Sequence, residues 1–161
     1  MSVSADSLRA VMRVFPTGVT IVATSNNGVC RGLTVNSFVS LSLNPLRVLV
    51  SISKSSHCHP LIQEAGIYSV NLLSEAQRDI SSRFADPNDD EFHCFSETKY
   101  TSGVTGCPLI QGSIGHIESR IVDEVDVGDH TLFIGSVVSA QIESEDKPLV
   151  YFDGDYVTLD I

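Results

Sequence analysis

The stretch Gly128-Asp129-His130 places an ionisable ring directly after a turn, and it leads into the apolar run at residues 131–138. A tight turn at the mouth of a strand can aim one imidazole into a pocket. Because histidine titrates near neutrality, such a ring can donate a hydrogen bond to a ligand amide. Taken alone, a single histidine is more often structural or merely exposed. We expect Asp129 to order the turn rather than the ring, since adjacent residues of a strand point to opposite faces.

Two polar stretches elsewhere in the chain carry groups suited to ligand binding. The run Thr34-Val35-Asn36-Ser37 can present backbone groups and an amide to the edge of a planar heterocycle, or it can form a β-bulge with satisfied hydroxyls. The run Lys54-Ser55-Ser56-His57 offers a cation, hydroxyls and backbone N–H groups to a phosphate, or it is an ordinary polar turn. Arg83 either adds a second cation to that phosphate site or stabilises the C-terminus of a predicted helix through its dipole.

Other chemistry-bearing patterns in the sequence are weak. The runs His57-Cys58-His59 and His93-Cys94 lack the spacing of zinc fingers and zinc ribbons, so we predict no metal site. The sequence has no G-x-S-x-G, H-E-x-x-H, P-loop or G-x-G-x-x-G motif, which leaves a serine hydrolase or a Rossmann enzyme without support.

Composition narrows the class of protein further. The 161 residues are 42% hydrophobic, which predicts a single folded domain over residues 1–161. A net charge of −10 argues against nucleic acid as a partner, because phosphate backbones require Lys and Arg. No apolar stretch approaches the roughly 20 residues that span a bilayer, and the N-terminus lacks a secretory signal, so we expect no membrane association and a cytoplasmic protein. The four irregularly spaced cysteines predict free thiols.

The hydrophobic periodicity predicts short strands, few helices and several hairpins, which together favour an antiparallel barrel. Ser4 is a plausible N-cap for an amphipathic helix, and Asn26-Asn27-Gly28 and Asp153-Gly154 are hairpin turn signals. We expect helices over residues 4–14, 60–65 and 75–84, strands over 19–24, 29–35, 38–43, 47–53, 67–73, 114–125, 131–142, 149–152 and 156–159, and a long surface loop over 86–106.

Taken together, these segments resemble the short-chain flavin reductases, the reductase components of two-component flavin-dependent monooxygenases such as phenol and 4-hydroxyphenylacetate hydroxylases. The resemblance covers nearly the whole chain. It is carried by residues 15–20, 34–45, 68–73, 83–85, 128–131 and 148–152. It implies a mainly β split barrel, that is, an antiparallel Greek-key FMN-binding barrel with a few short helices, working as a homodimer with the flavin near the subunit interface.

The resemblance also implies which residues form the site. Those that line the isoalloxazine and ribityl side of FMN or FAD are Thr34, Val35, Asn36 and Ser37, with Ser40 and Leu41 nearby. Those that approach the ribityl phosphate are Ser51, Ser53, Lys54, Ser55, Ser56 and His57, helped by Arg83 and Phe84. Those that contact the nicotinamide nucleotide are His130, Tyr151, Phe152, Gly154 and Tyr156. The phosphate loop of this chain has one cationic residue, Lys54, whereas some relatives carry more.

The activity implied by the resemblance is hydride transfer from NADH, or from NADPH, to FMN or FAD, with reduced flavin passing to a separate monooxygenase. In this mechanism His130 orients the nicotinamide and is not a nucleophile. Two alternatives keep the fold. The first is a flavoprotein that holds its flavin tightly and reduces another acceptor, such as a corrinoid. The second is a non-catalytic module that binds flavin or heme.

Overall fold

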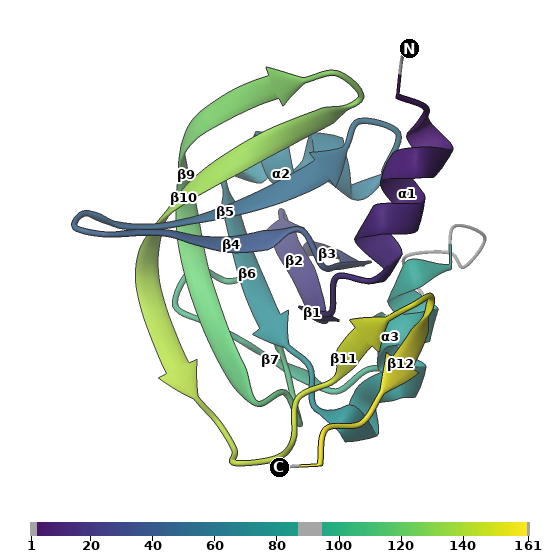
Figure 1. The fold of residues 1–161 in the computed structure, drawn as a ribbon. Helices are drawn as coiled ribbons and strands as arrows, with labels where there is room; N and C mark the ends of the chain where they lie inside the picture. The colour runs from purple at the N-terminus through teal and green to yellow at the C-terminus, as the bar shows by residue number, and fades with distance from the viewer. Residues whose placement is uncertain (1–2, 87–94, 161) are drawn as a thin grey trace.

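The computed structural model describes residues 3–86 and 95–160, and a curved seven-stranded sheet forms its centre (Figure 1). The strands lie in the order β3-β2-β6-β9-β10-β5-β4, and each neighbouring pair is antiparallel. Their bounds are β2 Thr20–Asn26, β3 Val29–Val35, β4 Phe38–Leu43, β5 Leu46–Ser53, β6 Ile67–Leu72, β9 Gly115–Val127 and β10 His130–Ile142.

The two edge strands of this sheet, β3 and β4, follow one another in the chain. Residues 36–37 join them, yet among the described residues the two strands do not pair with each other. The barrel is therefore open along this line, and the prediction of a mainly β, antiparallel split barrel is confirmed.

Local sequence explains why these strands form. In β5 the buried residues Val48, Val50 and Ile52 alternate with half-buried ones, which is the period of a strand with one face on the core. The β2–β3 turn places Asn27 at φ 50° and Gly28 at φ 81°, both in the left-handed region that asparagine and glycine tolerate. The predicted hairpin turn at residues 26–28 is confirmed.

Two apolar clusters form the core. One lies between α2 (Cys58–Ala65) and the sheet, with Ile62, Tyr68 and Phe133 fully buried. Tyr68 donates 3.3 Å hydrogen bonds to the carbonyls of Val48 and Phe133, and burial raises the pKa of its hydroxyl. Gly135 makes room for this ring, since a Cβ there would lie 2.5 Å from Tyr68 Oη.

The second core cluster joins the sheet to the C-terminal hairpin and to α3. Its members are Val19, Ile21, Ala23, Leu73, Phe84, Phe95, Ile110 and Leu149. The surrounding elements are β1 (Thr17–Gly18), β7 (Tyr100–Ser102), β8 (Pro108–Ile110), β11 (Val150–Phe152), β12 (Asp155–Val157), the 3-10 turn η1 (Glu75–Gln77) and α3 (Arg78–Ala85). Strand β1 pairs with β11 and β7 pairs with β8.

Three predicted boundaries are wrong. Strand β7 lies inside the predicted loop 86–106, because Tyr100 pairs with Ile110. No local sequence pattern predicts this pairing. The predicted helix at residues 75–84 is split into η1 and α3, and α2 begins at Cys58 rather than at residue 60. Residues 87–94 of the loop lie outside the described residues.

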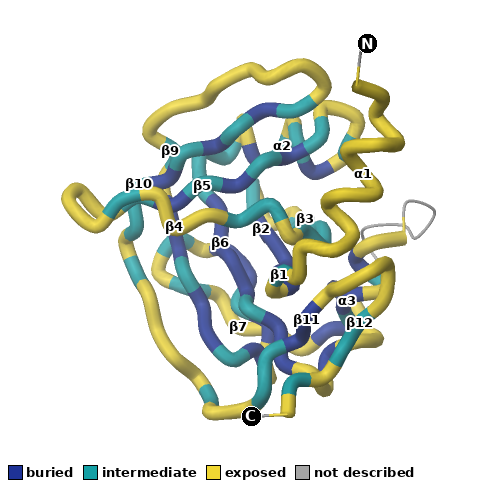
Figure 2. Tube along the Cα trace, in the orientation of Figure 1, coloured by how far each residue is buried: buried dark blue, intermediate teal, exposed yellow. Residues whose placement is uncertain are grey.

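The N-terminal helix α1 (Ala5–Arg13) stands on the surface of the barrel, and Figure 2 shows it exposed along its length. Ser4 caps it as predicted, accepting a 3.1 Å hydrogen bond from the Ser7 N–H. Its C-terminal end is held by Arg13, whose side chain donates to Asp153 Oδ1 at 3.1 Å. Among the described residues, no helix combines the length and the apolar character that crossing a membrane requires.

Candidate functional site

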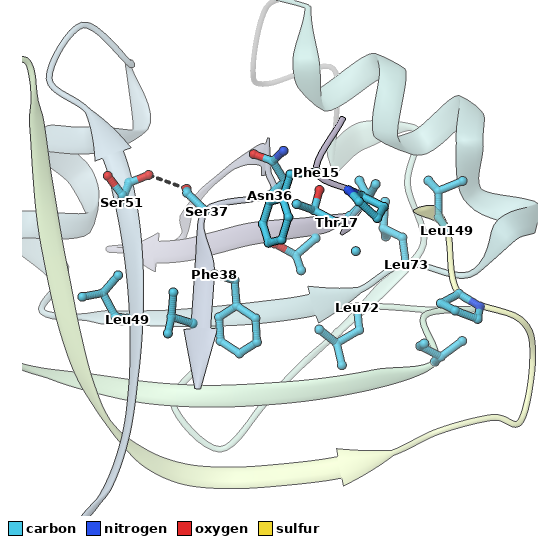
Figure 3. A pocket seen from close by; sticks show the side chains of 17 residues that line it. Phe15, Thr17, Asn36, Ser37, Phe38, Leu49, Ser51, Leu72, Leu73 and Leu149 are labelled. Atoms are coloured by element: carbon cyan, nitrogen blue, oxygen red, sulfur yellow. Dashed lines mark hydrogen bonds between the residues drawn. The ribbon is translucent and has the colours of Figure 1, made fainter. Parts of the chain in front are cut away.

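A groove of about 610 Å³ opens beside the split in the barrel (Figure 3). Its walls are mostly apolar, and its polar groups come from the 36–37 connection, from β5 and from β1. The lining residues are Phe15, Pro16, Thr17, Gly18, Val19, Thr20, Asn36, Ser37, Phe38, Val39, Leu49, Ser51, Leu72, Leu73, Ile114, Pro148 and Leu149. An apolar groove with a few placed polar groups is the usual form of a cofactor site.

Ser37 and Ser51, two of the predicted flavin contacts, lie side by side in this groove. The Ser37 hydroxyl donates to the Ser51 carbonyl at 2.7 Å, and the Ser51 N–H donates to the Ser37 carbonyl at 3.2 Å. These bonds join the 36–37 connection to β5.

Thr17 has the one groove hydroxyl that is buried without a hydrogen-bond partner among the described residues. An unpaired buried hydroxyl costs free energy unless a ligand or solvent satisfies it. The groove therefore fits a ligand that combines a broad apolar face with hydrogen-bonding edges, as the isoalloxazine of a flavin does.

A second pocket of about 250 Å³ adjoins the groove. Val19 and Asn36 line both hollows, so the two sites share a wall. The remaining residues of the smaller pocket are Thr34, Val35, Ala85, Tyr151 and Tyr156. The structure thus brings the predicted flavin segment at residues 34–37 next to two of the predicted nucleotide contacts.

Tyr156 is held firmly in the wall of the smaller pocket. Its hydroxyl lies 2.8 Å from Ser81 Oγ, and the Arg78 guanidinium lies 5.2 Å from its ring centroid. Its ring meets Tyr151 edge to face at 5.7 Å. Thr34 Oγ1 donates to the Ser81 carbonyl at 2.6 Å, which ties the same helix to the predicted flavin segment.

His130 begins β10, on the face of the sheet that carries Ser51. It pairs with Ser53, and Leu132 pairs with Ser51, so His130 lies one repeat, about 7 Å, farther along the strand. The His130 side chain is 42% exposed and lines neither of the two pockets. The imidazole therefore stands beside the groove and is accessible to a second ligand.

The expectation that Asp129 does not reach the ring is wrong. Asp129 Oδ1 lies 2.8 Å from His130 Nδ1, and this hydrogen bond holds the pKa of Asp129 below its usual range. Asp129 belongs to the turn rather than to the strand, so the alternation of strand side chains does not apply to it. A carboxylate only accepts, hence Nδ1 carries the proton and Nε2 is left for a ligand.

The predicted phosphate loop follows β5 directly. The Ser53 and Ser55 hydroxyls lie 2.9 Å apart, and Lys54 Nζ lies 3.3 Å from Asp126 Oδ1 and 3.2 Å from the Gly128 carbonyl. Ser56 accepts from the N–H of Cys58 at 3.2 Å, and His57 is exposed. The ammonium of Lys54 has three donors, so one remains after these two contacts.

Several other predicted site residues lie outside both pockets. Phe84 is buried in the core, where its ring meets Phe95 at 5.0 Å, and Arg83 pairs with Glu97 at 3.6 Å. The remaining ones, Ser40, Leu41, Phe152 and Gly154, are exposed on β4 and on the C-terminal hairpin. His93 and Cys94 lie outside the described residues, and Cys30, Cys58 and Cys107 are free thiols as predicted.

Sequence reasoning missed the residues that complete the groove. Thr17 and the apolar pairs Leu72-Leu73 and Pro148-Leu149 reach it from three separate segments. Backbone bonds join them, because Leu73 N–H donates to the Val19 carbonyl at 3.1 Å and Leu149 N–H donates to the Leu73 carbonyl at 2.9 Å. These residues lie in motifs that carry the family resemblance, at residues 15–20, 68–73 and 148–152, but those motifs did not single them out as ligand contacts.

Comparison with known proteins identifies the family. Residues 12–160 match the family model described as flavin reductase like domain. A flavin reductase of Pseudomonas putida is 38% identical over 149 residues, which is 92% of this chain and 86% of the relative. The reductase subunit HsaB of a flavin-dependent monooxygenase from Rhodococcus jostii is 35% identical over 152 residues, 94% of this chain and 76% of the relative.

A solved structure agrees with these sequences. The NADH:FAD oxidoreductase SgcE6 of Streptomyces globisporus, in complex with NAD and FAD fragments, is 31% identical and superposes with a TM-score of 0.89, covering 99% of this chain and 96% of that one. This chain belongs to the flavin reductase-like domain family. The prediction of an NAD(P)H-dependent flavin reductase is confirmed at the level of the family.

Proposed function

We propose that this protein transfers a hydride from NADH to FMN or FAD and passes the reduced flavin to a separate monooxygenase. The observation that carries the proposal is the pair of adjoining pockets with Asn36 and Val19 in their common wall. Hydride transfer needs two planar rings face to face, so it needs two contiguous sites. The monooxygenase partner is supported by the match to a reductase subunit of such an enzyme.

The larger groove is the proposed flavin site. Asn36, Ser37 and Ser51 supply its polar edge, and the unpaired hydroxyl of Thr17 lies in the same wall. The loop at residues 53–57 follows the groove along β5 and offers hydroxyls, the free donor of Lys54 and His57 to the flavin phosphate. Flavin, when bound, supplies the hydride-accepting chemistry, and the protein orients it.

The nicotinamide nucleotide is proposed to lie between the smaller pocket and His130. Tyr151 and Tyr156 offer aromatic surface there, and both are anchored by the contacts described above. The Nε2 atom of His130 is free to contact the carboxamide, because Nδ1 is taken by Asp129. His130 thus orients the donor ring and takes no proton from it.

We further propose a homodimeric, cytoplasmic protein. Exposed apolar stripes flank the groove, with Leu8, Met12 and Phe15 on α1 and just after it on one side and Val39 and Leu41 on β4 on the other. Patches of this kind mark association surfaces, and a second copy would cover them. Three free thiols, Cys30, Cys58 and Cys107, support a reducing compartment.

The test is a steady-state assay of NADH oxidation in which FMN and FAD are crossed against NADH and NADPH. We expect turnover that depends on added flavin and a lower KM for NADH than for NADPH. In His130→Ala, the KM for NADH should rise while the Kd for flavin stays unchanged. No flavin-dependent turnover with either nucleotide would overturn the proposal. Flavin that survives gel filtration at full occupancy would contradict release to a partner.

A further inference from the structure

The turn that carries His130 is braced by a chain of polar contacts that reaches back to helix α2. His59 Nε2 lies 2.8 Å from Thr131 Oγ1, and Thr131 Oγ1 lies 3.2 Å from Asp126 Oδ1. The same carboxylate oxygen lies 3.3 Å from Lys54 Nζ. The four side chains come from α2, from β10, from β9 and from the residue after β5, so the contacts join three elements and one loop residue around one turn.

The chemistry of the groups determines the direction of every bond in this chain. The Asp126 carboxylate only accepts, and the Lys54 ammonium only donates. The Thr131 hydroxyl therefore gives its proton to Asp126 and accepts the proton on His59 Nε2. Consistent with this, the bonds from Lys54 and Thr131 hold the pKa of Asp126 below its usual range.

Lys54 connects this chain to the backbone of the turn. Its Nζ donates to the Gly128 carbonyl at 3.2 Å, and its backbone N–H donates to the Asp129 carbonyl at 2.9 Å. Gly128 has φ 56°, in the left-handed region that glycine adopts without strain, and the two Lys54 bonds hold this turn in addition to the pairing of Val127 with His130. Asp129 in turn accepts from the ring of His130 at 2.8 Å.

The braces and the imidazole lie on opposite faces of the sheet. Thr131 is buried on the side covered by α2, where the His59 ring also packs 5.2 Å from Phe133, whereas His130 lies on the outer face. The side chains of His59 and Thr131 therefore do not contact the His130 imidazole directly. Lys54 and the backbone of residues 128–129 link the two sides.

We propose that His59 and Thr131 are positioning residues for nicotinamide binding, acting through Asp126 and Lys54 on the turn that aims His130. This inference rests on the proposed function, because it assumes that His130 contacts the nicotinamide. It assigns a role on the nucleotide side to Lys54, which sequence reasoning placed only at the flavin phosphate.

The test compares Thr131→Val with Thr131→Ser. Valine has the shape of threonine without the hydroxyl, so it breaks the chain while filling the same space, whereas serine keeps the hydroxyl. We expect Thr131→Val to raise the KM for NADH by about fivefold, the scale of one lost hydrogen bond, with kcat and the Kd for flavin unchanged. Thr131→Ser should return the KM for NADH to the wild-type value.

A double-mutant cycle separates this role from a general loss of structure. In a His130→Ala background, adding Thr131→Val should not change the KM for NADH further, because the imidazole that these contacts position is then absent. Asp126→Asn should act like Thr131→Val. Asp123→Asn is the matched control, because Asp123 is an exposed carboxylate on the same strand and, among the described residues, accepts a hydrogen bond only from the N–H of its neighbour Glu124.

The outcomes distinguish the inference from the function on which it rests. Wild-type protein without NADH-dependent flavin reduction would overturn the proposed function and the inference with it. An active wild type in which Thr131→Val leaves the KM for NADH unchanged would overturn the inference alone. So would an effect of Thr131→Val that is as large in the His130→Ala background, or a rise in the Kd for flavin that matches the rise in KM.

Discussion

The carboxylate of Glu118 is 2% exposed and is held by the turn that follows β7. It accepts hydrogen bonds from the N–H groups of Val104 at 3.0 Å and Thr105 at 2.8 Å, and from the Thr105 hydroxyl at 2.6 Å. Gly103 passes so close to the carboxylate that a Cβ there would overlap it. One buried acid, distant in the sequence, thus organises this turn.

Replacing this carboxylate by an amide should destabilise the protein. In Glu118→Gln, one acceptor oxygen becomes an N–H₂ group that faces existing donors, which leaves a buried donor unpaired at a cost of about 1–3 kcal/mol. We expect the Tm to fall by roughly 2–10 °C. The control is Glu64→Gln, an exposed position on α2. An equal fall in Tm for both variants would contradict this account of Glu118.

At the scale of elements, Gln77 joins the start of α3 to the segment after β8. Its Oε1 accepts from the Ser74 N–H at 3.1 Å and its Nε2 donates to the Gln111 carbonyl at 2.9 Å, with the side chain 5% exposed. Gln77→Ala should lower the free energy of unfolding by about 1–2 kcal/mol, because both partners lose a buried hydrogen bond.

Two further variants apportion this effect in urea unfolding experiments. Gln77→Glu keeps the acceptor for Ser74 but sets a buried, acceptor-only carboxylate against the Gln111 carbonyl, so it should be less stable than Gln77→Ala. Glu75→Ala alters an exposed residue of the same turn and should be near neutral. A Gln77→Ala protein as stable as Glu75→Ala would show that the bridge contributes nothing.

Elements with a local signature were predictable from the sequence. Ser4 and an apolar stripe predicted helix α1, and the pairs Asn27-Gly28 and Asp153-Gly154 predicted two hairpin turns. These features were predictable because caps and left-handed turns depend on a few adjacent residues. Strands β1 and β7 were not predictable. Each is two or three residues long and exists only because a distant segment, β11 or β8, pairs with it.

The same distinction applies to the site. Asn36 and Ser37 were found because polar residues between apolar strands are conspicuous in a sequence, whereas Ser51, inside a strand, was implied only by the family resemblance. The structure places all three in one groove. Leu72, Pro148 and Leu149 look like ordinary core residues, and only the fold shows that they line it. Lys54 was identified as a cation, but its ties to Asp126 and Gly128 follow from strand pairing that sequence alone does not reveal.

For the whole molecule, the surface carries both a net charge of −10 and an uncovered apolar stripe on the edge strand β4. Val39, Leu41 and Leu43 of this strand are 48%, 45% and 81% exposed, and a bulge between Ser40 and Ser42 turns Leu43 away from the face that carries Val39. Val39 also lines the groove, so the stripe is continuous with the proposed flavin site. A second copy covering β4 would bury this stripe and close the groove from outside.

A charge placed on the stripe should therefore prevent dimer formation and weaken flavin binding together. We expect the wild type to sediment at twice the 17.4 kDa chain mass and Leu43→Glu to sediment as a monomer, with a raised Kd for FMN or FAD. Ile142→Glu is the matched control, because Ile142 is an equally exposed apolar residue, 87% accessible, at the far end of β10. A monomeric wild type would refute the proposed dimer. A monomeric Leu43→Glu variant that binds flavin with the wild-type Kd would not contradict the dimer, but it would show that the groove is complete within one chain.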